Sequence, residues 1–125
     1  MTGSTSVGEQ LARAVAAKDR AAFARILADD VDFLGLTPRR AWEATGPAAV
    51  AAVYFDHWFE PSDTIQALVE VTTGDDVADT QHVSYRLDLV NDDGEQVAEQ
   101  QAYFRTTAGR ISHLRVLCSG FRPRT

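Results

Sequence analysis

Apolar residues recur every three or four positions in the first half of the chain and at every second position in the second half. Ser6 and Glu9 have the spacing of a capping box at the start of the helical pattern, which predicts an amphipathic helix over residues 7–17. Asp19 has the position of an N-cap for a second, short helix, and Asp29 follows where that helix ends. The chain is therefore expected to open with two consecutive helices.

A short strand, a loop and a third helix are expected next. Alternating apolar residues predict a strand over residues 31–34, and the polar run 36–45, which contains Trp42, is typical of a loop. Pro47 stands where the first turn of a helix tolerates a proline, and Pro61 ends the helical pattern that follows. The third helix is thus predicted between these two prolines.

From Asp63 onward the apolar period changes to two, and the polar separators contain the Gly and Asp residues typical of hairpin turns. The predicted strands cover residues 64–73, 77–90, 95–106 and 110–118. Three helices followed by a four-stranded antiparallel meander predict an α+β fold. We expect one domain over residues 1–125, with residues 1–5 as a disordered tail.

Alternation also predicts which side chains of the sheet face the helices. The inner face is expected to hold Val77, Asp79, Gln81, Val83, Tyr85, Leu87, Leu89, Gln96, Ala98, Gln100, Ala102, Phe104, Leu114, Val116 and Cys118, with Ile111 on the opposite face. Asp79, Gln81 and Gln100 interrupt this face, and buried polar groups need partners. Polar groups inside a curved sheet therefore predict a pocket.

The outer face of the sheet is predicted to be polar and rich in Arg and Tyr, which are enriched in protein interfaces. Its members are His82, Ser84, Arg86, Glu99, Gln101, Tyr103, Arg105, His113 and Arg115. We therefore expect a homodimer that pairs through this face.

Composition excludes several classes of partner. The chain has 125 residues and a net charge of −6, so a phosphate-binding face for nucleic acid is not expected. The single Cys118 cannot form an intrachain disulfide, and no apolar run is long enough to span a membrane. The N-terminal segment lacks the features of a signal peptide, so a cytoplasmic location is expected.

Four segments resemble the SnoaL-like branch of the nuclear transport factor 2-like superfamily. They are AAKDRAAFARILADDVDF, TGPAAVAAVY, YRLDLV and QAYFRTTAGRISHLRVL, and their order and spacing match over residues 7–120. The resemblance implies a cone-shaped α+β barrel with an internal pocket, often dimeric through the outer sheet face. Members of the superfamily include ketosteroid isomerases, polyketide cyclases, epoxide hydrolases and non-catalytic binding domains, so the fold alone does not define the function.

The catalytic groups of the ketosteroid isomerases are missing. The resemblance places their general base at Gly35, their protonated carboxylic acid at Ala102 and their oxyanion-hole tyrosine near Leu11. Only a tyrosine of the pocket wall is matched, by Tyr54. Residues 110–118 contain no Asp or Glu that could match the aspartate of the polyketide cyclases.

Arg86 and Asp88 are similar to the R-x-D pair of the limonene-epoxide-hydrolase type. That chemistry needs a second carboxylate on the last strand, where this chain has Val116. Alternation places both residues on the outer face, so we expect a cross-strand ion pair or an interface contact there.

Three residues remain as candidates for acid–base chemistry. Tyr54 and His57 are three apart on the predicted third helix, so Tyr54 could donate a hydrogen bond while His57 moves a proton. Asp79 is a candidate general base if it is buried, although Asp75 and Asp76 just before it favour a place at the wet rim of the hairpin. The candidates for substrate binding are Trp58, Gln81, Tyr85, Gln100, Phe104, Val116 and Cys118, with Trp42 and Phe59 as further apolar walls. Cys118 is interpreted as a small buried hydrophobe, and Gln81 and Gln100 could instead bridge adjacent strands.

Two functions are consistent with these residues. The first is a cofactor-free isomerase or cyclase that acts on a hydrophobic, carbonyl-containing, polyketide-like metabolite. The second is a ligand-binding or dimerisation domain without catalysis. The three histidines are far apart in sequence, so neither a metal nor a cofactor is expected.

Overall fold

Two helices with polar N-caps open the chain in the computed structural model, which describes residues 6–124. The predicted tail over residues 1–5 lies outside the described residues. Helix α1 (Val7–Ala17) begins where the Ser6 hydroxyl accepts a hydrogen bond from the Glu9 amide at 3.1 Å. Helix α2 (Arg20–Arg25) begins where the Asp19 carboxylate accepts from the Ala22 amide at 3.0 Å. Both predicted caps are confirmed.

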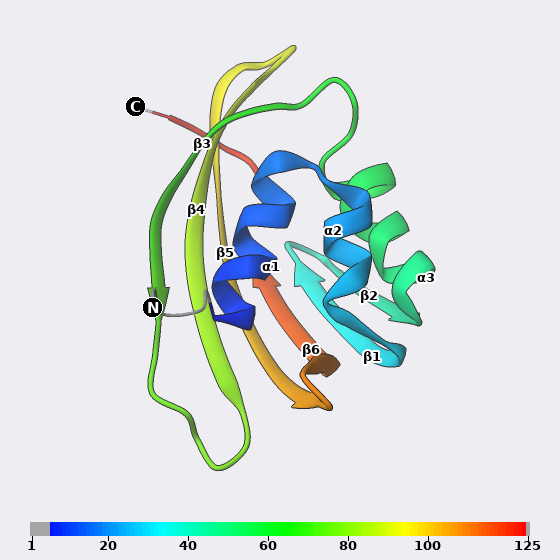
Figure 1. Ribbon diagram of the computed structural model, residues 1–125. Helices are drawn as coiled ribbons and strands as arrows, with labels where there is room; N and C mark the ends of the chain where they lie inside the picture. Colours follow the sequence, from blue (N-terminus) through cyan, green and yellow to red (C-terminus); the bar gives the residue numbers. More distant parts are fainter. Residues whose placement is uncertain (1–5, 125) are drawn as a thin grey trace.

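The strands form one curved, unclosed sheet, and helices lie against its inner face (Figure 1). The strands are β1 (Leu27–Thr37), β2 (Arg40–Thr45), β3 (Thr64–Thr73), β4 (Gln81–Asn91), β5 (Gly94–Thr107), β6 (Arg110–Cys118) and β7 (Arg122–Pro123). The order across the sheet is β2-β1-β6-β5-β4-β3, and β7 pairs with β5. Strands β1 and β6 run parallel and the other pairs are antiparallel. The predicted α+β class is confirmed.

The segment 36–45, predicted to be a loop, is instead part of a hairpin. Strand β1 runs on to Thr37, a two-residue turn follows, and β2 returns along β1 with Thr37 opposite Arg40. Arg39 occupies this turn with a positive φ of 70°. The proline and arginines of this segment suggested a loop, but the turn needs only two of its residues. Trp42 therefore lies on a strand.

The second long strand begins later than alternation predicted. Val77 and Thr80 form an isolated bridge, Ala78 has a positive φ of 55°, and the continuous ladder of β4 starts only at Gln81. The turn after β3 thus extends to Thr80, and Val77 is 77% exposed. Asp79 is exposed in this turn, so its predicted place on the inner face is wrong.

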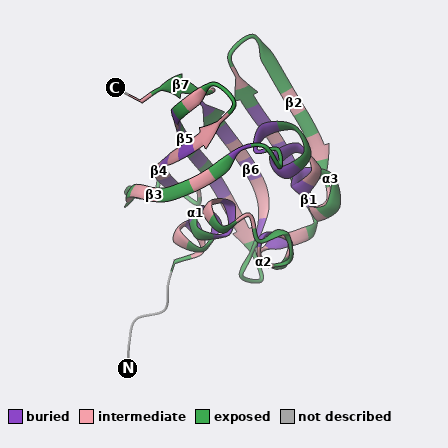
Figure 2. Cartoon of the chain, turned by 90° about the horizontal axis from the view of Figure 1, so that it is seen from above, coloured by how far each residue is buried: buried purple, intermediate pink, exposed green. Residues whose placement is uncertain are grey.

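The remaining alternation of the sheet agrees with the structure, with one exception. The buried side of β4, β5 and β6 carries Val83, Tyr85, Leu87, Leu89, Gln96, Ala98, Gln100, Ala102, Phe104, Leu114, Val116 and Cys118 (Figure 2). Ile111 is also buried, contrary to the prediction. A register shift between Arg105 and Thr106 of β5 reverses the alternation at this end of β6.

The third helix changes its winding part-way along. Helix α3 (Pro47–Ala52) continues as a π-helical segment, η1 (Val53–Trp58), in which the Phe59 amide donates to the Tyr54 carbonyl at 2.7 Å. Bonds from i to i+5 widen the turn. Tyr54 and Trp58 therefore both face the core, whereas His57 is exposed. The predicted common stripe of Tyr54 and His57 is wrong for this reason.

The end of η1 is tied to the first helix by Lys18, the only lysine of the chain. Its ammonium donates to the Glu60 carbonyl at 2.7 Å and to the carbonyl of Asp63. The Asp63 carboxylate accepts from the Glu60 amide and from Asn91, each at 3.0 Å. These contacts fix the segment that leads from η1 into β3.

Gly35 of β1 allows the aromatic part of η1 to lie directly on the sheet. A Cβ at this position would stand 2.6 Å from an outer ring atom of Trp58 and 2.7 Å from the ring of Phe33. Only glycine fits at position 35, because the Trp58 ring fills the space into which any side chain would project.

The outer face carries a few exposed apolar side chains among its polar ones. Leu36, Tyr103 and Leu117 are 44%, 42% and 55% exposed. Together with Leu34, Arg115 and Val116, they line a shallow hollow of about 200 Å³. The homodimer through this face stays a prediction.

Replacing Gly35 with alanine should destabilise the fold by about 1–3 kcal/mol, because an added methyl overpacks the contact with Trp58. Gly74→Ala is the matched control, since its Cβ would meet only the half-buried ring of His82, at 2.8 Å. Chemical denaturation of both variants measures the difference. A Gly35→Ala variant as stable as the control would contradict the close packing.

Candidate functional site

A cluster of aromatic rings fills the space between η1 and strand β1. The ring centroids of Tyr54 and Trp58 lie 4.7 Å apart, and Phe33 is 5.9 Å from each. Phe23 of α2 packs on the other side of Tyr54 at 4.7 Å. Tyr54 and Trp58 are four residues apart on η1, so their rings lie on the same side of the helix and both meet Phe33.

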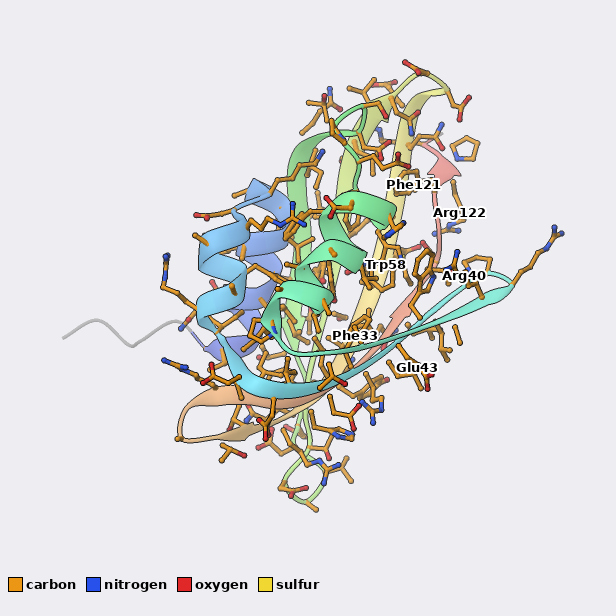
Figure 3. All side chains as sticks on the ribbon, turned by 90° about the vertical axis from the view of Figure 1, so that its right-hand side faces the viewer. Phe33, Arg40, Glu43, Trp58, Phe121 and Arg122 are labelled. Carbon is orange, nitrogen blue, oxygen red and sulfur yellow. The ribbon has the colours of Figure 1, made fainter. Side chains whose placement is uncertain are left out.

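A small cavity opens beside this cluster, between β2, the end of η1 and the segment after β6. Its volume is about 190 Å³, and it is lined by Thr37, Trp42, His57, Trp58, Phe59, Cys118, Gly120 and Phe121. Figure 3 shows Trp58 and Phe121 in the same part of the molecule, on the side that faces the viewer. Ligand pockets commonly measure about 300–1,000 Å³, so the cavity suits a small ligand or the apolar end of a larger one.

A chain of hydrogen bonds runs across the inner face of the sheet toward this cavity. The Tyr85 hydroxyl donates to Oε1 of Gln100 at 2.5 Å, and Nε2 of Gln100 donates to Sγ of Cys118 at 3.4 Å. Gln100 is 1% exposed, so both ends of its amide are satisfied within the protein. Because Cys118 also lines the cavity, the chain ends at the cavity wall.

Two buried donors of η1 lack a partner: Trp58 lines the cavity, and Tyr54 packs against the Trp58 ring. The hydroxyl of Tyr54 and the indole Nε1 of Trp58 make no hydrogen bond of normal geometry, although the Tyr85 hydroxyl lies near that of Tyr54. Tyr54 is fully buried, and Trp58 is 7% exposed. Leaving such a group unpaired costs about 1–3 kcal/mol, so two of them on successive turns of one helix indicate a place for an acceptor from outside the protein.

The ionisable groups of this interior are held neutral. Burial raises the pKa of Tyr54 well above its ordinary value, and the nearby Tyr85 and Cys118 raise it further. Burial likewise raises the pKa of Tyr85 and of the Cys118 thiol. The phenols therefore act as hydrogen-bond donors near neutral pH, and Cys118 is a thiol rather than a thiolate nucleophile.

The structure brings together only part of the predicted site. Tyr85, Gln100 and Cys118 form the buried chain, and Trp58 and His57 line the cavity. His57 is exposed at the mouth, where its ring lies 5.3 Å from that of Trp42.

The other candidates lie elsewhere. Phe104 packs in the core, where its ring would meet a Cβ placed on Gly8 of α1 at 3.3 Å. Gln81 is half-buried at the start of β4, opposite Phe104. Val116 is buried beside Gly35 on the neighbouring strand, and Asp79 lies in its exposed turn, outside the residues that line the cavity.

Arg86 and Asp88 lie on the outer face, as predicted, but their ion pairs differ from a cross-strand pair. Arg86 Nε lies 3.7 Å from Asp88 Oδ1 on the same strand, and Arg124 Nη1 lies 3.3 Å from Asp88 Oδ2. Asp88 thus helps to hold the C-terminal segment against the sheet.

Sequence reasoning missed the C-terminal part of the cavity. Phe121 packs on Phe59 at 5.8 Å, and Gly120, with a positive φ of 72°, lies against Pro38. Residues 119–121 have no apolar period, so no sequence pattern marked them. Gly120, which follows β6, was the only residue in the sequence that indicated a specific backbone conformation there.

Other features of the described residues do not add to this site. A larger hollow of about 840 Å³ lies between α1, α2 and the β5–β6 turn, and its lining includes the exposed Arg13, Arg25 and Arg110 but none of the predicted site residues. Within residues 6–124, no group of three or more His, Cys, Asp or Glu side chains is placed to hold a metal ion. Over the same range, no helix has the length and hydropathy needed to cross a membrane.

The three helices on a curved sheet, with neutral donors enclosed between them, define the class of protein. The chain belongs to the SnoaL-like domain family, whose model matches residues 8–114, and so to the nuclear transport factor 2-like superfamily. No curated protein matches it by sequence.

Solved structures share the fold at low identity. A candidate isomerase from Rhodopseudomonas palustris is 18% identical with a TM-score of 0.72, over 96% of this chain and 93% of that one. A candidate polyketide cyclase from Xanthomonas campestris is 20% identical with a TM-score of 0.68, over 89% and 86%. A ketosteroid isomerase-like protein from Erwinia carotovora is 19% identical with a TM-score of 0.67, over 94% and 92%.

Two of the three tyrosines of the chain should resist ionisation until the protein unfolds. Burial raises the pKa of Tyr54 and Tyr85 in the folded state, whereas the unfolded chain ionises its phenols near pH 10. The free energy of unfolding is therefore expected to fall as pH rises above about 10, because only the unfolded state releases these protons. Phenolate absorbance, followed together with circular dichroism, measures this. Ionisation of all three tyrosines before any loss of structure would contradict it.

Proposed function

We propose that this protein binds a small hydrophobic carbonyl compound in the aromatic cavity and catalyses a cofactor-free isomerisation or cyclisation of it. The observation that carries the proposal is the pair of unpartnered buried donors, Tyr54 Oη and Trp58 Nε1. A carbonyl oxygen accepts two hydrogen bonds, and the proposal places one such oxygen between these two donors. Cavity walls made mainly of aromatic side chains suit the apolar remainder of the ligand.

Neutral donors beside a carbonyl also favour enolisation. As a base removes an α-proton, the electron pair moves onto the carbonyl oxygen, and donors fixed in a dry site stabilise the charge that develops there. Tyr54 suits this task because its raised pKa keeps the proton on the phenol. If the ketone is β,γ-unsaturated, the dienolate takes the proton back at its γ-carbon, and the double bond moves into conjugation. If the compound has a second carbonyl, the enolate carbon attacks it, and the proton returns from the base to the new alkoxide, which completes a cyclisation.

His57 is the residue proposed to move the proton. Among the described residues that line the cavity, it is the one with an imidazole, and none of them is Asp or Glu. A neutral imidazole can accept an α-proton and return it near neutral pH. Asp79 is not part of this proposal, because its exposed turn lies away from the cavity.

The second candidate function is binding without catalysis. The specific observation that favours it is the exposure of His57, which leaves the buried interior with donors but without a buried base. Both candidates require the cavity to bind a carbonyl compound, and they differ only in whether a proton moves.

Binding is tested with cyclohexyl methyl ketone and the intrinsic fluorescence of the protein. The chain has two tryptophans, and both line the cavity, so their emission reports on this site. Tyr54→Phe should weaken binding about fivefold or more, the effect of roughly 1 kcal/mol for one hydrogen bond. The same change should leave the melting temperature equal or higher, because the hydroxyl it removes has no partner in the free protein.

The exposed Tyr103→Phe is the matched control and should change neither quantity. A Tyr54→Phe variant that binds the ketone as tightly as the unaltered protein would remove Tyr54 from the site. Loss of stability in that variant would indicate a structural hydroxyl instead.

Catalysis is tested by exchange of the α-protons of the same ketone in deuterium oxide, followed by proton NMR. The protein should accelerate the exchange, and His57→Gln should slow it by about a hundredfold or more, the usual contribution of a general base. His113→Gln, on the outer face, is the control. Binding without accelerated exchange would establish the non-catalytic alternative.

A further inference from the structure

The positively charged side chain of Arg40 lies against one wall of the cavity. The guanidinium of Arg40 lies 3.5 Å from the ring centroid of Trp42, and Trp42 forms one wall of the cavity. The Trp42 ring is fixed in turn, because its Nε1 donates to the Thr37 hydroxyl at 2.9 Å. Arg40 and Trp42 are two apart on β2, so their side chains leave the strand on the same face. Figure 3 places Arg40 in the same region as Trp58 and Phe121.

Arg40 is not neutralised within the part of the chain that the structure describes. Other arginines near this end of the molecule have carboxylate partners: Arg122 pairs with Glu99, and Arg20 pairs with Asp56 at 2.8 Å. Arg40 has only its contact with the Trp42 ring, which uses none of its N–H groups as hydrogen-bond donors.

The lining of the cavity differs from the chain as a whole, which has 18 Asp and Glu against 12 Lys and Arg. None of the described residues that line the cavity is acidic. The acidic protein as a whole repels anions, whereas this rim presents the unpaired guanidinium of Arg40 and the imidazole of His57. Asp56, the acid beside His57, is paired with Arg20. The local charge therefore selects for a negative group at the rim.

We propose that the ligand of the cavity carries a carboxylate, which Arg40 binds at the mouth while the carbonyl reaches the buried donors. This inference rests on the proposed function and adds the substrate class: hydrophobic keto acids rather than neutral ketones. A guanidinium presents its N–H groups as a planar fork that fits a carboxylate, and the Trp42 ring holds that fork in place without using its donors. Arg40 is thus a specificity residue, and it has no part in the proton transfer.

The test compares a keto acid with its neutral ester. Cyclohexanecarbonyl-propionic acid and its methyl ester share the cyclohexyl group and the ketone, and they differ in the charge at the other end. Tryptophan fluorescence gives the affinity of each for the unaltered protein, for Arg40→Gln and for Arg39→Gln. Arg39, the neighbouring residue in the exposed turn, is the matched control because its replacement removes the same charge.

The unaltered protein should prefer the acid over the ester by about fivefold, the upper range for an ion pair exposed to water. Arg40→Gln should abolish this preference without weakening the ester, Arg40→Lys should keep part of it, and Arg39→Gln should leave it intact. Equal preference in the unaltered protein and Arg40→Gln would overturn the inference, while binding of the ester would still support the proposed function. Failure of both compounds to bind the unaltered protein would overturn the proposed function, and the inference with it.

Discussion

The packing of the Trp58 ring on the bare backbone of Gly35 is the constraint on which the site depends. It brings η1 against β1, closes one wall of the cavity and leaves the indole N–H without a partner. The position that the superfamily resemblance assigns to a general base is the same Gly35. The room beside Gly35 is filled by the Trp58 ring, so the described interior offers neutral donors at this place.

The polar groups inside the sheet divide into two sets with different tasks. Tyr85, Gln100 and Cys118 satisfy one another and bridge β4, β5 and β6 without needing a ligand. Tyr54 and Trp58 are left over. A buried network is favourable only when each member is paired, so the complete set rigidifies the wall while the incomplete set is available for binding.

The sequence predicted the helices, their caps and most of the inner face, because burial imposes a regular period on each element. It misplaced Asp79, because a turn that continues past its glycine cannot be distinguished from a strand by alternation alone. It also misplaced His57, since the spacing of an α-helix does not hold in a π-helical segment. The cavity was only partly predictable, because Trp42 and Phe121 meet there through a hairpin and a C-terminal segment that no local pattern connects.

The parallel pairing of β1 with β6 has a consequence for how the chain reaches this state. Gly35 lies beside Val116, and Phe33 beside Leu114, so β1 completes its ladder with residues far downstream in the chain. Until β6 emerges from the ribosome, β1 keeps one unpaired edge, which is the kind of surface that recruits other strands. Contacts so distant in sequence also slow folding. Until β6 has been made and has paired, this edge of β1 is therefore open to pairing with strands of other chains.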